Sequence, residues 1–291
     1  MTHRGLRTGE PGWRAEPRVS AQVTIRHFTD PGCPFAFSAE RQRHRLRWLY
    51  GDQIAWELHM IVLAERNGEW RSSARFRELQ LRYGMPIDWR ERLWGAATIH
   101  ACRAVVAARL RWPERAGALL RRLRVLSMAG ELLDVSDTLE LAAEQAGLPV
   151  AALAAYCAEP EVEEALRADM RAARSPSPAG RAQDYKLGGP PEERRYTCPS
   201  YEMVSDGMRL DLPGFRPIEA YEAALANLEP ALERRPDPES APEVLGWAGI
   251  PLATAEVATV CDREIPDVRA ELARDGARFE PVGGDGYWTP A

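Results

Sequence analysis

The stretch TDPGCPFAF, residues 29–37, joins two segments of different character. Residues 23–28 before it are apolar and rich in β-branched side chains, which predicts a strand, and residues 38–50 after it are typical of a helix. The turn therefore places Cys33 at or beside the helix cap and Pro34 near the first helical position, where its missing N–H costs nothing. Unpaired backbone N–H groups and the positive end of the helix dipole favour a thiolate there. We therefore expect Cys33 to be the reactive group of the protein.

The composition is that of an acidic globular protein. The 291 residues, 45% of them hydrophobic, are enough to form one large domain or two modest ones. A net charge of -5 argues against a protein whose whole surface follows nucleic acid or an anionic membrane. Of the 38 basic residues only Lys186 is a lysine, a bias to which we attach no functional meaning.

The five cysteines argue for a reduced protein. They are odd in number and widely spaced, with no CxxC pair and no Cys/His cluster at the spacing of a metal site. Residues 1–20 are polar and lack the apolar core of a secretory signal, and no segment is apolar enough to span a membrane. We expect a cytoplasmic protein with a flexible lead at residues 1–20, no membrane association and no bound metal.

The rest of the chain alternates between segments with strand, helix and loop patterns. Residues 54–62 read as a second strand, so a βαβ unit would place the Cys33 turn at the carboxyl edge of a sheet, where ligands usually bind. Helical periodicity fills residues 71–174, which predicts an all-helical insertion. Residues 175–191 read as loop, and a strand entered through Pro199, a hairpin turn at residues 205–207 and a helix from residue 217 follow.

This order of elements resembles the DsbA-like family of the thioredoxin superfamily over roughly residues 23–229. The specific motifs are D-P-x-C-P at residues 30–34 and the Cys198-Pro199 step, and residues 84–88 also look like the family. The resemblance implies an α/β, thioredoxin-like fold, with its core formed by residues 21–70 and 175–236 and a helical insertion at residues 71–174. The family includes disulfide oxidoreductases, mycothiol-dependent reductases, kappa-class glutathione transferases and 2-hydroxychromene-2-carboxylate isomerases.

The resemblance also implies the site. Cys33 matches the nucleophilic cysteine, and Pro199 matches the proline that the superfamily holds in cis beside it. The groups expected to contact a substrate or thiol lie in the same turn, beside the cis proline and in the helical insertion. They are Pro34, Phe35, Ala36, Thr197 and Met85. Met85 belongs to a Met/aromatic region that could wall a ligand pocket or simply pack between helices.

Ala36 departs from the family pattern, because disulfide enzymes carry their second cysteine there. Three chemistries survive its loss. A small thiol such as mycothiol or glutathione, acting as co-substrate with no bound cofactor, could resolve a mixed disulfide on Cys33. Cys198 could act as a relocated resolving cysteine, or the site could bind a thiol cofactor for transfer or isomerisation. A non-catalytic binding protein is the competing class, and we favour the single-cysteine oxidoreductase acting on a disulfide or electrophile.

Residues 237–291 follow a Pro-rich linker and predict three helices and a hairpin, which resemble a winged helix. This segment has eleven acidic and four basic residues, a net charge of -7, which is the wrong sign for DNA binding. We expect the module to pack on the oxidoreductase domain, to cover its site or to form a homodimer contact, with no nucleic-acid partner.

Several other polar residues receive structural interpretations. Asp30 is expected to close the turn by accepting backbone N–H groups, as Asx residues do. His27 and His59 lie in predicted strands and are expected to be satisfied or surface residues. Cys102, Cys157 and Cys261 are expected to be small core or helix residues.

Overall fold

A computed structural model describes residues 21–70 and 73–291, so the expected lead at residues 1–20 lies outside the described residues. A mixed four-stranded sheet of order β2-β1-β5-β6 stands at its centre. The strands are β1 (Val23–Thr29), β2 (Ile54–Met60), β5 (Ser200–Ser205) and β6 (Met208–Leu212). β1 and β2 are parallel, and β5 runs antiparallel to both of its neighbours. The strands and the hairpin turn between β5 and β6 agree with the sequence prediction.

The crossover from β1 to β2 is helical, as predicted, but it contains two helices. α1 (Pro34–Ser38) is separated from α2 (Glu40–Tyr50) by Ala39 alone, and the 3-10 turn Gly51–Gln53 leads into β2. The parallel pairing of β1 with β2 places the Cys33 turn at the carboxyl end of β1.

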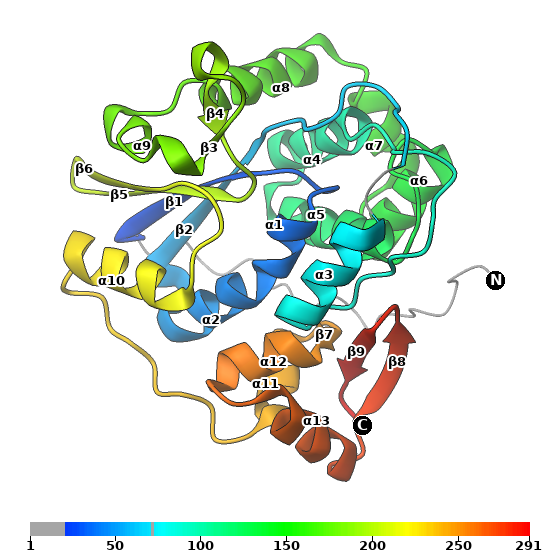
Figure 1. Ribbon diagram of the computed structural model, residues 1–291, viewed down its shortest axis with the longest axis vertical. Coiled ribbons are helices and arrows are strands. Elements are labelled where there is room, and N and C mark those ends of the chain that lie inside the picture. Colours follow the sequence, from blue (N-terminus) through cyan, green and yellow to red (C-terminus); the bar gives the residue numbers. More distant parts are fainter. Residues whose placement is uncertain (1–20, 71–72) are drawn as a thin grey trace.

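Helices cover both faces of the sheet (Figure 1). On one face, Val23 and Ile25 pack with Trp48 of α2 and Leu225 of α10 (Ile218–Leu228) in one apolar core. On the other face, Phe28 packs with residues from the end of α8 and from β4. The sheet is therefore buried on both sides, which explains the nearly continuous apolar character of β1.

The region between β2 and β5 is mostly helical. Its helices are α3 (Ser73–Tyr83), α4 (Ile99–Arg111), α5 (Pro113–Met128), α6 (Ser136–Gln145), α7 (Val150–Tyr156), α8 (Pro160–Ala173) and α9 (Pro178–Arg181). Two short strands and two 3-10 turns follow: Asp184–Lys186, β3 (Leu187–Gly188), Pro191–Glu193 and β4 (Arg195–Tyr196). The prediction of plain loop for residues 175–191 was therefore wrong, because elements of two to four residues are too short to show periodicity.

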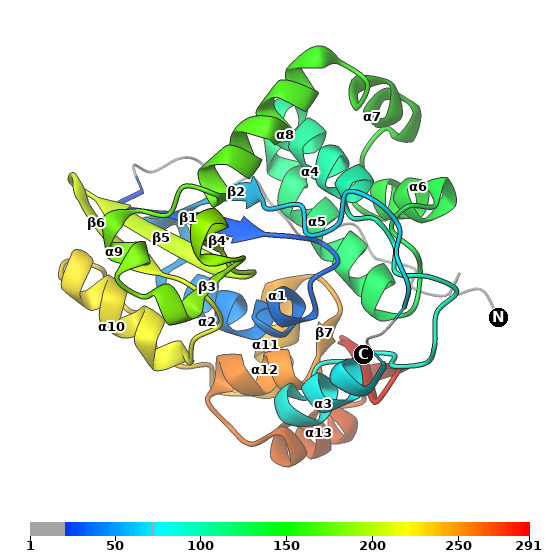
Figure 2. The ribbon, with the colours of Figure 1, turned by 45° about the horizontal axis from the view of Figure 1, so that its top comes forward.

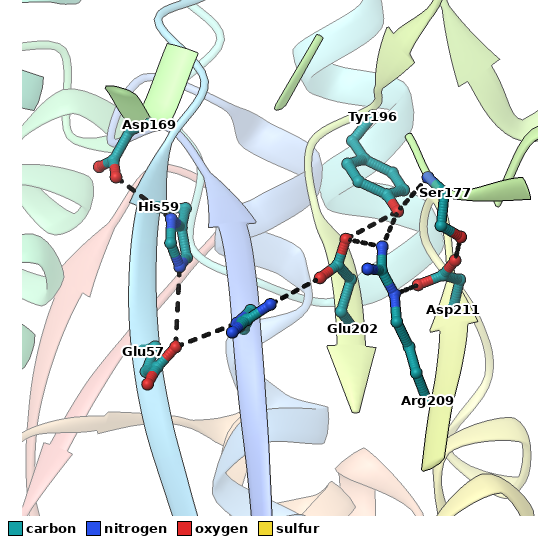
Figure 3. A network of polar contacts seen from close by, with 9 residues as sticks. Glu57, His59, Asp169, Ser177, Tyr196, Glu202, Arg209 and Asp211 are labelled. Carbon is teal, nitrogen blue, oxygen red and sulfur yellow. Dashed lines mark hydrogen bonds and ion pairs between the residues drawn. The ribbon is translucent and has the colours of Figure 1, made fainter. Parts of the chain in front are cut away.

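A polar network crosses the second face of the sheet (Figure 3). His59 Nδ1 lies 3.1 Å from Asp169 of α8, and Arg26 of β1 pairs with Glu57 at 3.2 Å and with Glu202 at 3.6 Å. The Tyr196 hydroxyl donates to Glu202 at 2.9 Å. These contacts tie α8 and β4 to the sheet, and His59 is a satisfied residue, as expected.

The C-terminal segment adds three helices and a three-stranded sheet. They are α11 (Ala241–Ala248), α12 (Thr254–Cys261), α13 (Ile265–Arg274), β7 (Leu252–Ala253), β8 (Arg278–Val282) and β9 (Asp285–Thr289). The sheet order is β7-β9-β8, so a two-residue strand joins the predicted hairpin.

The C-terminal segment is joined to the main sheet by a shared core. α12 lies against α2 (Figure 2). One apolar core extends from Val23 of β1 to Leu272 and Trp288 of the C-terminal segment. In the described part of the chain, no helix is both long and apolar enough to cross a membrane.

Candidate active site

The turn after β1 is held by Asp30, which is fully buried. Its Oδ1 accepts the backbone N–H of Gly32 at 2.7 Å, as expected for an Asx turn, and its Oδ2 accepts the N–H of Leu63 at 2.8 Å and the hydroxyl of Thr98 at 2.7 Å. Gly32 is required sterically, because a Cβ at this position would lie 2.7 Å from a methyl group of Thr98. The turn that presents Cys33 is therefore rigid.

Cys33 occupies the N-cap position of α1, with Pro34 in the first turn. Its Sγ donates to the backbone carbonyl of Cys198 at 3.3 Å, and the peptide bond between Cys198 and Pro199 is cis. Cys33 and Cys198, 165 residues apart in the sequence, thus lie side by side.

The surroundings of Cys33 favour its thiolate. A hydrogen bond from the Cys198 thiol is the largest influence and lowers the pKa of Cys33. Burial raises that pKa, and the backbone N–H groups of Ala36 and Phe35 lower it further, with a net downward shift. Burial and the neighbouring Cys33 raise the pKa of Cys198 well above its ordinary value. The pair therefore holds its negative charge on Cys33, as a nucleophile requires.

Cys33 opens onto a cavity of about 1180 Å³ although its own exposure is only 4%. Phe35, Thr197 and Cys198 line the cavity beside it. The walls come from α2, α3, the segment around Lys186, the start of α10, and the C-terminal α12 and α13. Both ribbon views place α3 beside α1, and α12 packs against α2 (Figures 1 and 2). A small substrate could therefore reach the sulfur while bulk water is largely kept from it.

Comparison with known proteins agrees with this geometry. The model of the DSBA-like thioredoxin domain matches residues 24–180, more than half of the chain. The chain belongs to this DsbA-like family. It is a family of thiol–disulfide oxidoreductases, and the fold is its thioredoxin-like fold.

Solved structures show the same DsbA-like fold at low sequence identity. A "probable DsbA oxidoreductase" from Streptomyces coelicolor is 18% identical with a TM-score of 0.53, and the match covers 74% of this chain and 92% of that one. The cytosolic disulfide reductase DsbM from Pseudomonas aeruginosa is 16% identical with a TM-score of 0.52, over 70% and 97% of the two chains. A search of curated proteins gave no match.

The structure brings most of the expected site residues together. Cys33, Phe35, Thr197 and Cys198 line the cavity, and Thr197 donates from its hydroxyl to the Lys186 carbonyl at 2.7 Å. Pro34 is half-buried next to them, and Ala36 and Pro199 are buried. Ala36, where the resemblance leads us to expect a second cysteine, offers no sulfur or polar group.

Met85 is an exception to this grouping. It is fully buried in a core with Phe37 and Phe76 and does not line the cavity. We correct its interpretation from substrate contact to core residue, because its side chain is enclosed by apolar neighbours, whereas Tyr83 of the same region does line the cavity.

Sequence reasoning missed the basic residues of the cavity. The lining includes Arg41, Arg75, Arg82, Lys186 and Arg195. Arginine is so frequent in this chain that no local cluster stands out, and only the folded arrangement collects them. Lys186, the single lysine of the chain, was the one residue of this group that its rarity marks in the sequence.

A buried charged network lies behind the site. Arg124, fully buried, donates to Thr29 of β1 and to Glu40 of α2. Glu40, His44 and Glu256 form the group in the described residues whose donor atoms, within 4.8 Å of one another, could hold a cation. Arg121 already binds Glu256 in bidentate fashion at 2.6 and 2.7 Å. Guanidinium groups thus neutralise both carboxylates, and we assign the network a structural role.

Proposed function

We propose that the protein is a single-cysteine thiol–disulfide oxidoreductase. The observation that carries the proposal is the position of Cys33, which faces a large cavity and has its Sγ 3.3 Å from the carbonyl oxygen of Cys198. The lowered pKa of Cys33 agrees with it. Ala36 supports the single-cysteine mechanism because it offers no second sulfur in the turn.

The proposed reaction has two exchange steps. The Cys33 thiolate attacks one sulfur of a disulfide RSSR, which forms a Cys33–SR mixed disulfide and releases RS⁻. A small thiolate R′S⁻ then attacks the SR sulfur, which forms RSSR′ and releases the Cys33 thiolate. In sum RSSR and R′S⁻ become RSSR′ and RS⁻, and the protein returns to its starting redox state with Cys33 as a thiolate. In a compartment that keeps thiols reduced, such as the cytoplasm, the thiol pool drives this reaction towards reduction.

Cys198 provides a second route, which the contact between the two cysteines favours. Its thiol would lose a proton and attack the Cys33 sulfur of the mixed disulfide, forming a Cys33–Cys198 disulfide and releasing RSH. The raised pKa of Cys198 slows this step, because little thiolate is present at neutral pH. We therefore propose resolution by a small thiol as the main route.

A pH titration of Cys33 alkylation by iodoacetamide, followed by mass spectrometry of the Cys33 peptide, tests the proposal. In the wild-type protein we expect the alkylation rate to rise with an inflection below about 8.5, the ordinary cysteine pKa. In Cys198→Ala we expect a higher inflection, because the S–H donor is lost. Cys33→Ser gives the background of the other cysteines. An inflection near 8.5 in both proteins contradicts the proposal and favours a binding protein.

A second measurement separates the two routes. We expect the wild-type protein treated with 2-hydroxyethyl disulfide to keep a mixed-disulfide adduct in its intact mass until a small thiol is added. Conversion of the adduct, without added thiol and only when Cys198 is present, to a species two hydrogens lighter than the reduced protein would show instead that Cys198 resolves the intermediate with release of RSH.

We also infer that the C-terminal segment is a winged-helix-like module that completes the oxidoreductase. The start of α13 lines the cavity, and α12 packs on α2. The segment's net charge of -7 supports a packing role over DNA binding.

A further inference from the structure

The cavity in front of Cys33 has a charge opposite to that of the whole chain. Eight of its lining residues are basic and four are acidic, whereas the chain has a net charge of -5. The basic residues are Arg41, Arg45, Arg75, Arg82, Lys186, Arg195, Arg234 and Arg263. Clefts with a charge of one sign concentrate ligands of the other sign.

Three of these cations already have carboxylate partners. Arg45 pairs with Asp237 at 2.9 Å, Arg234 pairs with the same carboxylate at 3.0 Å, and Arg263 pairs with Glu271 at 2.5 Å. The other five form no ion pair within residues 21–70 and 73–291. They come from α2, α3 and the segment of residues 186–195 that leads to Cys198.

Aromatic rings and backbone oxygens hold the free cations in place. The guanidinium of Arg75 lies 5.0 Å from the ring centre of Phe35, two residues after Cys33. Arg41 and Arg82 each lie 5.3 Å from the ring centre of Tyr83, and Arg41 also donates to the Tyr83 carbonyl at 3.3 Å. The buried Nε of Arg41 has no hydrogen-bond partner among the described residues. The guanidinium groups are thus positioned, and no carboxylate of the described residues pairs with them.

We propose that the disulfide or thiol that reacts at Cys33 is an anion, with carboxylate or phosphate groups that bind Arg41, Arg75 and Arg82. This inference rests on the proposed function and assigns its substrate a chemical class. Guanidinium groups bind both oxyanions through paired N–H donors. An uncharged small thiol or disulfide would leave these cations without partners, so an anionic one is selected.

The test compares three disulfides of different charge: glutathione disulfide, which is anionic, 2-hydroxyethyl disulfide, which is neutral, and cystamine, which is cationic. Each transfers one RS group to Cys33 and releases RS⁻, and the adduct is counted by intact mass against time. The proteins are the wild type, Arg75→Gln/Arg82→Gln, and Arg77→Gln, with Cys33→Ser as background. Arg77 is the matched control, since it is exposed on the same helix but does not line the cavity.

The decisive quantity is the rate constant for glutathione disulfide divided by that for 2-hydroxyethyl disulfide. We expect the double variant to lower this ratio roughly tenfold, the combined effect of two partly exposed ion pairs. Arg77→Gln should leave this ratio unchanged within about twofold. Added salt should lower the ratio in the wild type and in Arg77→Gln, but not in the double variant. Of the three disulfides, cystamine should react slowest with Cys33 of the wild type.

Two negative outcomes are distinguishable. Adducts that form at Cys33 with the same ratio in the double variant and the wild type, or fastest with cystamine, overturn the anionic substrate and leave the proposed function standing. Failure of all three probes to modify Cys33 above the Cys33→Ser background overturns the proposed function and this inference with it.

Discussion

His27 of β1 is a buried histidine that no ion pair stabilises within the described residues. It is 1% exposed, stacks on Tyr201 with ring centres 4.6 Å apart and meets Trp56 edge-on. Neither ring nitrogen has a hydrogen-bond partner in the described part of the chain. Burial first, and then the charges of Arg124 and Arg43, lower the pKa of His27 well below its ordinary value. The prediction of a satisfied or surface residue was therefore wrong, because the strand pattern does not show which neighbours offer hydrogen bonds.

We expect His27→Phe to change how stability depends on pH. The pKa of His27 is lower in the folded than in the unfolded state, so its stabilising contribution is complete above about pH 6.5 and is lost below it, at about 1.4 kcal/mol per pH unit. Phenylalanine does not titrate and fits a site between aromatic rings. Urea unfolding at pH 7.5, 6.5 and 5.5 should show the variant gaining on the wild type as the pH falls, whereas parallel curves would contradict the assignment.

The predictability of single residues depended on local chemistry. Cys33, Asp30 and Cys198 could be found because a turn motif and a Cys-Pro step mark them along the chain. Arg41, Arg75, Arg82 and Arg195 could not, since their role depends on which segments the fold brings to one cavity, and Met85 was misassigned for the same reason.

At the scale of elements, the turn between β8 and β9 is seated on the loop after α3. Gly283 has a φ of +55°, and a Cβ there would lie 2.1 Å from the carbonyl oxygen of Ile87. A Cβ on Gly284 would come 2.5 Å from the Gln80 side chain. The β8–β9 hairpin thus packs against α3 and the loop after it only because Gly283 and Gly284 at its tip have no side chains.

We expect Gly283→Ala to destabilise the protein by more than Gly207→Ala. Gly207 in the β5–β6 turn also has a positive φ, +79°, but a Cβ added there would meet no atom within 4 Å. The control should therefore cost only the left-handed strain of about 1–2 kcal/mol, and Gly283→Ala should cost at least about 1 kcal/mol more, since backbone must move. Urea unfolding measures both, and equal losses would show that the hairpin contact contributes nothing.

Elements of six residues or more were predictable because their periodicity is visible, as in β1, β2, α10 and α12. The elements that were missed, β3, β7 and α9, have two to four residues. Their formation depends on tertiary partners such as β9, which pairs with β7.

At the scale of the whole molecule, buried carboxylates join the helices to the C-terminal module. Glu40 and Glu256 are at most 2% exposed. Burial alone would raise the pKa of each carboxyl. For Glu40 the charges of Arg124, Arg43 and Arg121 outweigh burial and lower its pKa. For Glu256 the interactions with Arg121 and His44 do the same. Their contribution to stability is complete above the unfolded pKa of about 4.3 and is lost as the pH falls through the lower folded values.

We expect Glu256→Gln to lower the free energy of unfolding at pH 7 by about 3–5 kcal/mol, because Arg121 keeps a buried charge without its counter-charge. The difference from the wild type should shrink as the pH falls below about 4, where Glu256 itself becomes neutral. Urea unfolding followed by tryptophan fluorescence and circular dichroism should give one coincident transition, since the main sheet and the C-terminal segment share one apolar core. A constant difference between pH 7 and pH 3 would contradict this role of the ion pair.

The single lysine of the chain lines the cavity in front of Cys33. Apart from the α-amino group, Lys186 is therefore the one primary amine available to amine-selective reagents. A fluorophore or spin label coupled to it would report from the mouth of the active site without any engineered residue. Quenching of that label when an anionic disulfide enters would allow binding to be followed separately from the exchange chemistry at sulfur.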